Sequence, residues 1–205
     1  MRQFAPPYYL SVTQEDLVRY VRKFAAAADL PVFVYNIPQN AHIEFEVGTV
    51  LRLAEIPKIV GLKNSNGSID YITAVGCVKA QRPEFSLLVG TEEIMMAAIE
   101  AGADGSVCGG ANMFPALYVR LFEAAKNNHR AEAEELQDLI ARIARNIYSV
   151  GSMVTSYFRG LKGALALLGV CRETLGEPLT AFGPEDKREL HSRLKRLLPE
   201  IHERN

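Results

Sequence analysis

Short apolar segments recur along the first half of the chain at regular spacing, and this recurrence restricts the possible folds more than any other feature. The segments are 31–35 (PVFVY), 58–62 (KIVGL), 85–89 (FSLLV) and, shorter, 104–107 (DGSV), and their starts lie 27, 27 and 19 residues apart. Continuously apolar strands are typical of parallel sheets, whose two faces are both covered. The spacing leaves room for one helix after each strand, so the sequence predicts a series of βα units.

Helical patterns fill the intervals between these segments. Thr13 and Asp16 resemble a capping box that begins a helix, with Asp in place of the usual Glu or Gln. Residues 45–54 carry one apolar stripe, and the pattern over 92–101 ends at Gly102, a residue typical of helix ends. In the second half of the chain only helical patterns follow, over residues 116–126, 130–149, 155–168 and 184–198.

The number of units bears on the fold class. Residues 4–8 look like the end of a further strand, which gives about five βα units, whereas a complete (β/α)₈ barrel has eight units and typically about 250 residues. The sequence therefore predicts an α/β fold, either a smaller open sheet or a TIM barrel that lacks its N-terminal part. We expect residues 1–128 to form the partial barrel and residues 129–205 a helical extension packed on it. We expect an exposed strand edge at residues 4–8 to drive oligomerisation or instability.

Composition excludes several classes of protein. The 205 residues contain 23 Lys and Arg against 24 Asp and Glu, which is not the charge of a nucleic-acid-binding protein. We expect no membrane partner, because no apolar run reaches about 18 residues. The three cysteines lie far apart, and the N-terminus lacks the layout of a signal peptide, so a cytoplasmic location is expected. The four histidines have no metal-ligand spacing, and we expect no metal site and no cofactor.

Lys63 directly follows a predicted buried strand, and the carboxyl ends of parallel strands are where α/β folds build their sites. An amine held among apolar groups loses hydration, which leaves part of it neutral and able to attack a carbonyl. The alternative is an ordinary lysine that reaches the surface at a strand end. Tyr35 ends the preceding strand, and neighbouring strands lie about 4.8 Å apart, so the phenol and the amine can reach one substrate. The alternative for Tyr35 is a packed ring with its hydroxyl bonded to the backbone.

Several motifs, taken in order, resemble the N-acetylneuraminate lyase/dihydrodipicolinate synthase family of class I, Schiff-base-forming aldolases. The resemblance covers nearly the whole chain. It rests on residues 6–9 (PPYY), 35–38 (YNIP), 61–65 (GLKNS), 90–93 (GTEE), 102–107 (GADGSV), 111–112 (AN) and 158–162 (FRGLK).

The resemblance implies specific roles. Lys63 matches the Schiff-base lysine, and Tyr35 matches the tyrosine that relays protons and orients the substrate carboxylate. Tyr9 looks like the residue that reaches into a neighbouring subunit's site, and Val107 matches the position whose backbone carbonyl faces the keto acid. The family's fold is a (β/α)₈ barrel with a C-terminal helical cluster, and its members need no cofactor. The resemblance also implies pyruvate as a substrate and a homo-oligomer, either a dimer or a tetramer.

Departures from the family pattern bear on the substrate. Asn40 stands where dihydrodipicolinate synthases place an arginine that grips the aldehyde's carboxylate, which disfavours that reaction. Glu92 and Glu93, after Gly90, resemble the acidic pair with which lyases bind sugar hydroxyls, although acidic residues also suit a first helical turn. Ser65 can donate one more hydrogen bond to the substrate.

Together with these residues, the resemblance implies a pyruvate-dependent lyase that acts on a 2-keto-3-deoxy sugar acid or a similar 2-oxo acid. The same intermediate also permits condensation or dehydration. A different alternative is a catalytically inactive, truncated homologue, because the family's Gly-Ser/Thr-Thr-Gly-Glu loop, which binds the pyruvate carboxylate, is not in this sequence. Sialic acid itself is disfavoured, since Gly109 replaces a serine that sialic-acid lyases use.

Overall fold

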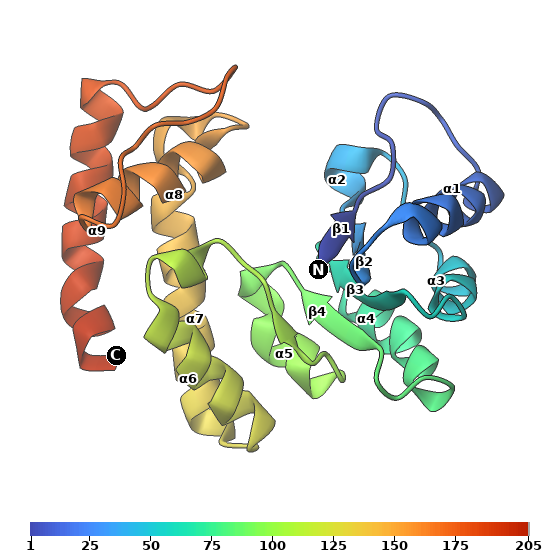
Figure 1. Cartoon of the computed structure of the whole chain (residues 1–205). Coiled ribbons are helices and arrows are strands. Elements are labelled where there is room, and N and C mark those ends of the chain that lie inside the picture. The colour runs from blue at the N-terminus through green and yellow to red at the C-terminus, as the bar shows by residue number, and fades with distance from the viewer. Residues whose placement is uncertain (205) are drawn as a thin grey trace. The chain divides into compact units, whose positions relative to one another are not determined.

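The protein's structure is a computed structural model that describes residues 1–204 (Figure 1). The chain divides into two compact units, Met1–Val107 and a second one that begins at Cys108. The predicted boundary between a partial barrel and a helical extension, at residues 128 and 129, stays a prediction.

The first unit contains a parallel sheet whose strands pair in chain order, β1-β2-β3-β4-β5. The strands are β1 (Arg2–Phe4), β2 (Val32–Asn36), β3 (Ile59–Asn64), β4 (Ser86–Val89) and β5 (Gly105–Ser106). The prediction of successive βα units in a parallel sheet is therefore confirmed. Four of the five strands lie within one or two residues of the predicted segments.

The strand predicted at residues 4–8 is wrong in its position. β1 ends at Phe4, and residues 8–10 form a bend. Pro6 and Pro7 explain the difference, since proline has no backbone N–H to donate to a sheet and is poorly tolerated inside a strand. The edge that β1 presents is consequently three residues long, and it precedes the two prolines.

Capping residues and glycine set several of the helix ends in the first unit. They are α1 (Gln14–Ala27), α2 (Pro38–Ala41), α3 (Val47–Ala54), α4 (Ile69–Gly76) and α5 (Met95–Glu100), with 3₁₀ turns at Cys77–Ala80 and Glu92–Ile94. The predicted capping box is present, because the Thr13 hydroxyl accepts from the Asp16 N–H while the Asp16 carboxylate accepts from the Thr13 N–H. The helix predicted over residues 92–101 is instead a 3₁₀ turn followed by α5, because Ile94 leaves helical geometry. Gly102, at φ +100°, ends it as expected.

Side chains alternate between the two faces of the sheet, as strand geometry requires. Val34, Leu62 and Leu87 are fully buried in the core, and α3 packs on β3 with α1 and α4 as its neighbours (Figure 1). Tyr35 and Lys63, one position further along β2 and β3, are only half-buried. The face opposite the packed core therefore carries Tyr35 and Lys63.

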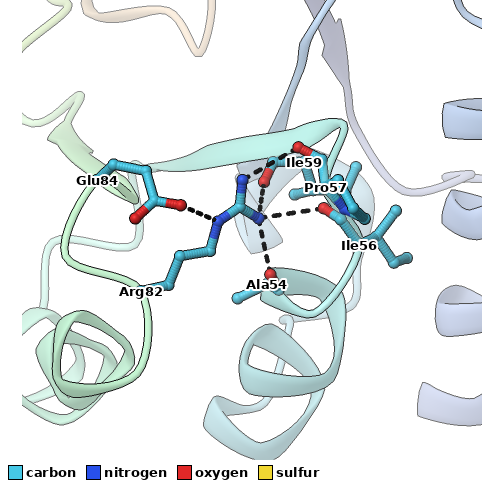
Figure 2. A network of polar contacts seen from close by, with 6 residues as sticks. All are labelled: Ala54, Ile56, Pro57, Ile59, Arg82 and Glu84. Carbon is cyan, nitrogen blue, oxygen red and sulfur yellow. Dashed lines mark hydrogen bonds and ion pairs between the residues drawn. The ribbon is translucent and has the colours of Figure 1, made fainter.

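Arg82 connects the end of α3 to the beginning of β3 (Figure 2). Its guanidinium donates to the carbonyls of Ala54, Ile56 and Ile59 through Nη1 and to that of Pro57 through Nη2, at 2.6–3.1 Å. A cation there also complements the negative end of the helix dipole. One side chain thus fixes the turn that leads into the strand that carries Lys63.

The second unit is helical. It comprises α6 (Pro115–Lys126), α7 (Arg130–Ile147), α8 (Ser156–Leu167) and α9 (Pro184–Arg204), with 3₁₀ turns at Gly110–Asn112 and Val150–Ser152. Helix α7 packs between α6 and α9, and α8 also contacts α9. Within residues 1–204, no helix combines the length and the apolar character needed to cross a membrane.

The prediction that the last helix ends at residue 198 is wrong, since α9 continues through Pro199 to Arg204. Its final turn is held by two contacts from elsewhere in the unit. Arg120 donates to the Arg204 carbonyl, and the Arg204 guanidinium pairs with Glu135 at 2.6 Å. These contacts compensate for the backbone hydrogen bond that a proline removes.

Candidate active site

Lys63 and Tyr35 are directly opposite each other at the carboxyl ends of β3 and β2. The Lys63 Nζ lies 4.3 Å from the centroid of the Tyr35 ring, over its face. An ammonium group is attracted to that face by the ring quadrupole. The amine is therefore held beside the phenol, and the proximity expected from the spacing of the two strands is present.

Ser65 and Gly90 complete the cluster around this amine. The Ser65 Oγ donates to the Tyr35 hydroxyl at 3.3 Å. A Cβ added at Gly90 would lie 2.0 Å from that Oγ and 2.9 Å from the Lys63 Cε, both shorter than van der Waals contact. Only glycine at position 90 leaves room for the serine hydroxyl and the lysine stem as they stand.

The other predicted site residues have different environments. Glu92 is buried at 3% exposure at the start of the 3₁₀ turn after β4, while Glu93 beside it is exposed. Val107, after β5, is 51% exposed, and Asn40 is exposed on α2. Tyr9 is 87% exposed, so its role at a subunit interface stays a prediction. The structure brings together Lys63, Tyr35, Ser65 and Gly90.

The sequence reasoning missed a buried polar network on the opposite face of the same strand ends. Asn36 Nδ2 donates to Asn64 Oδ1 at 2.8 Å and to the Glu44 carboxylate at 3.2 Å. Asn66 Nδ2 donates to the same carboxylate at 2.6 Å, and Asn64 Nδ2 donates to Asn66 Oδ1 at 2.7 Å. The signal in the sequence was an asparagine directly after both Tyr35 and Lys63.

Tyr71 of α4 extends the polar region. Its hydroxyl donates to the Phe45 carbonyl at 2.5 Å, next to Glu44 in sequence. Burial, and then the negative charge of Glu44, raise the pKa of the Tyr71 phenol well above its usual range. The phenol consequently remains a neutral donor.

Two further observations concern possible ligands. Within residues 1–204, no group of three or more His, Cys, Asp or Glu side chains is arranged to hold a metal ion. In the helical unit, a Cβ added at Gly109 would lie 2.1 Å from the Tyr157 hydroxyl. The space that a serine side chain would need at position 109 is therefore filled by a phenol.

Comparison with known proteins places this arrangement in a family. A profile of the Dihydrodipicolinate synthetase family matches residues 3–197. The 4-hydroxy-tetrahydrodipicolinate synthase of Albidiferax ferrireducens is 32% identical over 92% of this chain and 61% of its own. The solved dihydrodipicolinate synthase of Bacteroides thetaiotaomicron superposes with a TM-score of 0.90 at 39% identity, over 95% of this chain and 65% of its own. YagE of E. coli, a family member solved in complex with pyruvate, gives 0.86 at 25% identity over 96% and 65%.

The chain thus spans less than two thirds of the length of each of these relatives. The match nevertheless extends over almost all of its own residues, in both units. The predicted α/β fold of TIM-barrel type agrees with these relatives, and family members are lyases and synthases. The chain belongs to the dihydrodipicolinate synthetase family.

Proposed function

We propose that this protein is a class I aldolase that forms a Schiff base between Lys63 and a 2-oxo acid such as pyruvate. The observation that carries the proposal is the Lys63 amine held 4.3 Å from the centre of the Tyr35 ring at the carboxyl ends of two paired strands. Both side chains are half-buried, so part of each remains accessible from outside the packed core. The pyruvate complex of a 25% identical relative supports the same substrate class.

The chemistry follows from these two groups. The neutral Lys63 amine attacks the C2 ketone, and loss of water leaves a protonated imine. In that dehydration the Tyr35 phenol gives its proton to the departing hydroxyl. The phenolate that remains then accepts the proton of the C4 hydroxyl, while the electron pair of the C3–C4 bond flows toward the imine nitrogen. An aldehyde leaves, and the remaining enamine takes a proton at C3. Hydrolysis of the imine releases pyruvate and restores the amine.

For the substrate, we propose a 2-keto-3-deoxy sugar acid. Ser65 supplies a hydroxyl beside Tyr35, and Glu92 and Glu93 supply two carboxylates in the turn that follows Gly90. Carboxylates accept several hydrogen bonds from a polyol chain. The exposed Asn40 provides no charged fork for a second carboxylate.

A second candidate is the condensation that dihydrodipicolinate synthases perform. Its support is the 32% identity to a relative that carries that name. A third is a catalytically inactive homologue, which retains the fold and the Lys63–Tyr35 pair but does not turn over.

The test is to trap the imine. The protein is incubated with pyruvate and borohydride, and its intact mass is measured. We expect a gain equal to one pyruvic acid less one oxygen atom, because the imine loses water and then takes up hydrogen. Peptide analysis locates the adduct on Lys63. The adduct should be absent in Lys63→Ala and present in Lys23→Ala, since Lys23 is exposed on α1.

Absence of the adduct from the parent protein at millimolar pyruvate overturns the proposal. If the adduct forms, pyruvate release from 2-keto-3-deoxygluconate separates the lyase from the condensing enzyme. A protein that traps pyruvate but releases none from the sugar acid argues against the proposed substrate class.

A further inference from the structure

The strand register that brings Tyr35 opposite Lys63 is not fixed by the amino ends of the two strands. Val32 pairs with Ile59, but the next residue, Phe33, pairs with Gly61, so β3 has one extra residue at Val60. A bulge of this kind uncouples the pairing after it from the pairing before it. The segment after the bulge therefore needs its own determinants of register. The burial of Val34 and Leu62 is one, and polar contacts at the carboxyl ends can be another.

A shift of one residue in this segment would reverse the faces of Lys63 and Asn64, because successive side chains in a strand point to opposite sides. Lys63 would then face the packed core, and Asn64 would face the open side. The register consequently decides whether the amine is available at all.

The buried Asn36–Asn64 pair is well suited to specify this register. Both side chains are fully buried at 0% exposure, and they bond to each other at 2.8 Å across the strands, in the row directly after Tyr35 and Lys63. A buried amide without its partner is costly, so alternative registers that separate the two are disfavoured. A single buried asparagine is known to fix register in other folds.

The same two residues hold the rest of the cluster through their backbones. The Asn36 carbonyl accepts from the Ser65 N–H at 2.8 Å, and the Asn64 carbonyl accepts from the Gly90 N–H at 2.7 Å. Ser65 is the residue that donates to the Tyr35 hydroxyl, and Gly90 leaves room for it. All four residues of the candidate site are thus adjacent to the pair or bonded to it.

The loops that follow the strands anchor the pair from outside. The Phe45 N–H donates to Asn36 Oδ1 at 3.1 Å, and the Ser68 N–H donates to Asn66 Oδ1 at 2.9 Å. The Glu44 carboxylate accepts from Asn36 and Asn66 together. It thereby joins the loop between α2 and α3 to the loop that follows β3.

We propose that Asn36 and Asn64, with Glu44 and Asn66 as their anchors, are positioning residues that set the register of Lys63 against Tyr35. This inference rests on the proposed function, whose reacting amine it places. None of the four side chains acts on the substrate. Their effect is to keep the amine on the open face and beside the phenol.

The main test is Asn36→Asp, which keeps the shape and the acceptor for the Phe45 N–H but removes both donated bonds. It also places a carboxylate against Glu44. Asn36→Asp/Glu44→Gln restores a donor to that carboxylate without changing the size of either side chain. The Asn64 amide, once turned over, can donate its Nδ2 to the new carboxylate at position 36, so the bond between the strands is available again when the repulsion from Glu44 is gone. Asn64→Asp is a milder variant, because it still accepts from Asn36 and loses only the bond to Asn66. The matched control is Thr49→Val, which removes a buried hydrogen bond to Gln14 but none of the bonds of the four network side chains. Gln14 keeps its own bonds to the Glu44 carbonyl and the Glu46 N–H.

Two rates are measured on folded protein, with the folded fraction checked by circular dichroism. One is the rate of pyruvate–borohydride adduct formation at Lys63. We expect it to fall about tenfold or more in Asn36→Asp, since a small misplacement of a reacting group costs up to about a hundredfold. It should fall less in Asn64→Asp, and recover to within about threefold of the parent in the double variant. Thr49→Val should leave it unchanged.

The other rate is acetylation of Lys63 by an N-hydroxysuccinimide ester, divided by that of the exposed Lys23. This ratio needs no pyruvate, so it remains informative if the parent forms no adduct and the proposed function fails. We expect the ratio to fall in Asn36→Asp, because the amine turns toward the packed core, to return in the double variant and to stay constant in Thr49→Val. If Asn36→Asp does not fold, the acetylation ratios of Asn64→Asp and of the double variant, each compared with that of the parent, test the inference. An unchanged ratio in the folded network variants overturns the inference, as does an Asn36→Asp effect that the double variant fails to reverse.

Discussion

Replacing Arg82 by methionine tests how much of the first unit's stability depends on one side chain (Figure 2). Methionine keeps most of the aliphatic stem and removes the guanidinium. The Arg82 side chain is 17% exposed, and three of its four carbonyl partners, those of Ala54, Ile56 and Ile59, are bonded in partly buried surroundings. Removal of the donors takes the guanidinium bond from each of these carbonyls at the end of α3 and the start of β3, and the Ile56 carbonyl keeps its bond from the Ile59 N–H.

The magnitude follows from these three bonds. Each partly buried hydrogen bond contributes about 1 kcal/mol net, so we expect a loss of about 3 kcal/mol in the free energy of unfolding. With a urea dependence of about 2 kcal/mol/M, the midpoint falls by about 1.5 M. The fourth bond, to the Pro57 carbonyl, is exposed, and water replaces it at little cost.

The assay is urea unfolding followed by far-ultraviolet circular dichroism, with two companion variants. Arg82→Lys should fall between the parent and Arg82→Met, because an ammonium lacks the planar fork that reaches several carbonyls. Glu84→Ala is the matched control. Glu84 accepts from the Arg82 Nε at 2.8 Å but is 68% exposed, so its removal should leave the midpoint unchanged. Equal midpoints for Arg82→Met and Glu84→Ala would refute the reasoning.

Two further predictions concern glycine and the helix cap. Gly90→Ala should slow adduct formation at Lys63 with little loss of stability, because the new Cβ meets only side-chain atoms that can move. Gly61→Ala should instead lower the urea midpoint, because its Cβ would lie 2.4 Å from the Ser86 carbonyl oxygen. A larger loss of stability in Gly90→Ala than in Gly61→Ala would contradict this. The pKa of Asp16 is lowered by hydrogen bonds from the Thr13 hydroxyl and the Thr13 N–H and by the charge of Arg19. The Asp16 carboxylate therefore stabilises the fold at any pH above its ordinary pKa of 3.8. This contribution is lost as the pH falls through the lower pKa that Asp16 has in the folded state. Asp16→Asn should therefore melt below the parent at pH 7 and together with it once Asp16 is protonated, and a difference that persists in acid would exclude the carboxylate as its cause.

The sequence predicted those features that depend on local chemistry and on the period of the chain. The apolar runs located β2, β3 and β4, and the place of Tyr35 and Lys63 at the ends of successive strands predicted that the two side chains are close if those strands are neighbours, as they are. The Thr13 cap was readable because all its atoms lie within one helical turn. These features need no knowledge of distant contacts.

What the sequence did not reveal depends on residues far apart in the chain. Arg82 binds carbonyls 23 to 28 residues earlier, and nothing in its own neighbourhood marks it out. The Asn36–Asn64 bond spans 28 residues, and its anchor Glu44 belongs to an irregular loop. The bulge at Val60 is invisible as well, since an extra residue in an apolar run leaves the run apolar.

The chain-order pairing of the strands has a consequence for how the first unit is assembled. Each strand is laid beside the one that precedes it, so every new pairing closes a segment of similar, modest length, and the entropy lost on closure grows only slowly with that length. The unit can therefore be built by successive addition, without waiting for distant parts of the chain. Tyr35 and Lys63 meet as soon as the second addition is made, which places the amine beside the phenol before the later strands have joined.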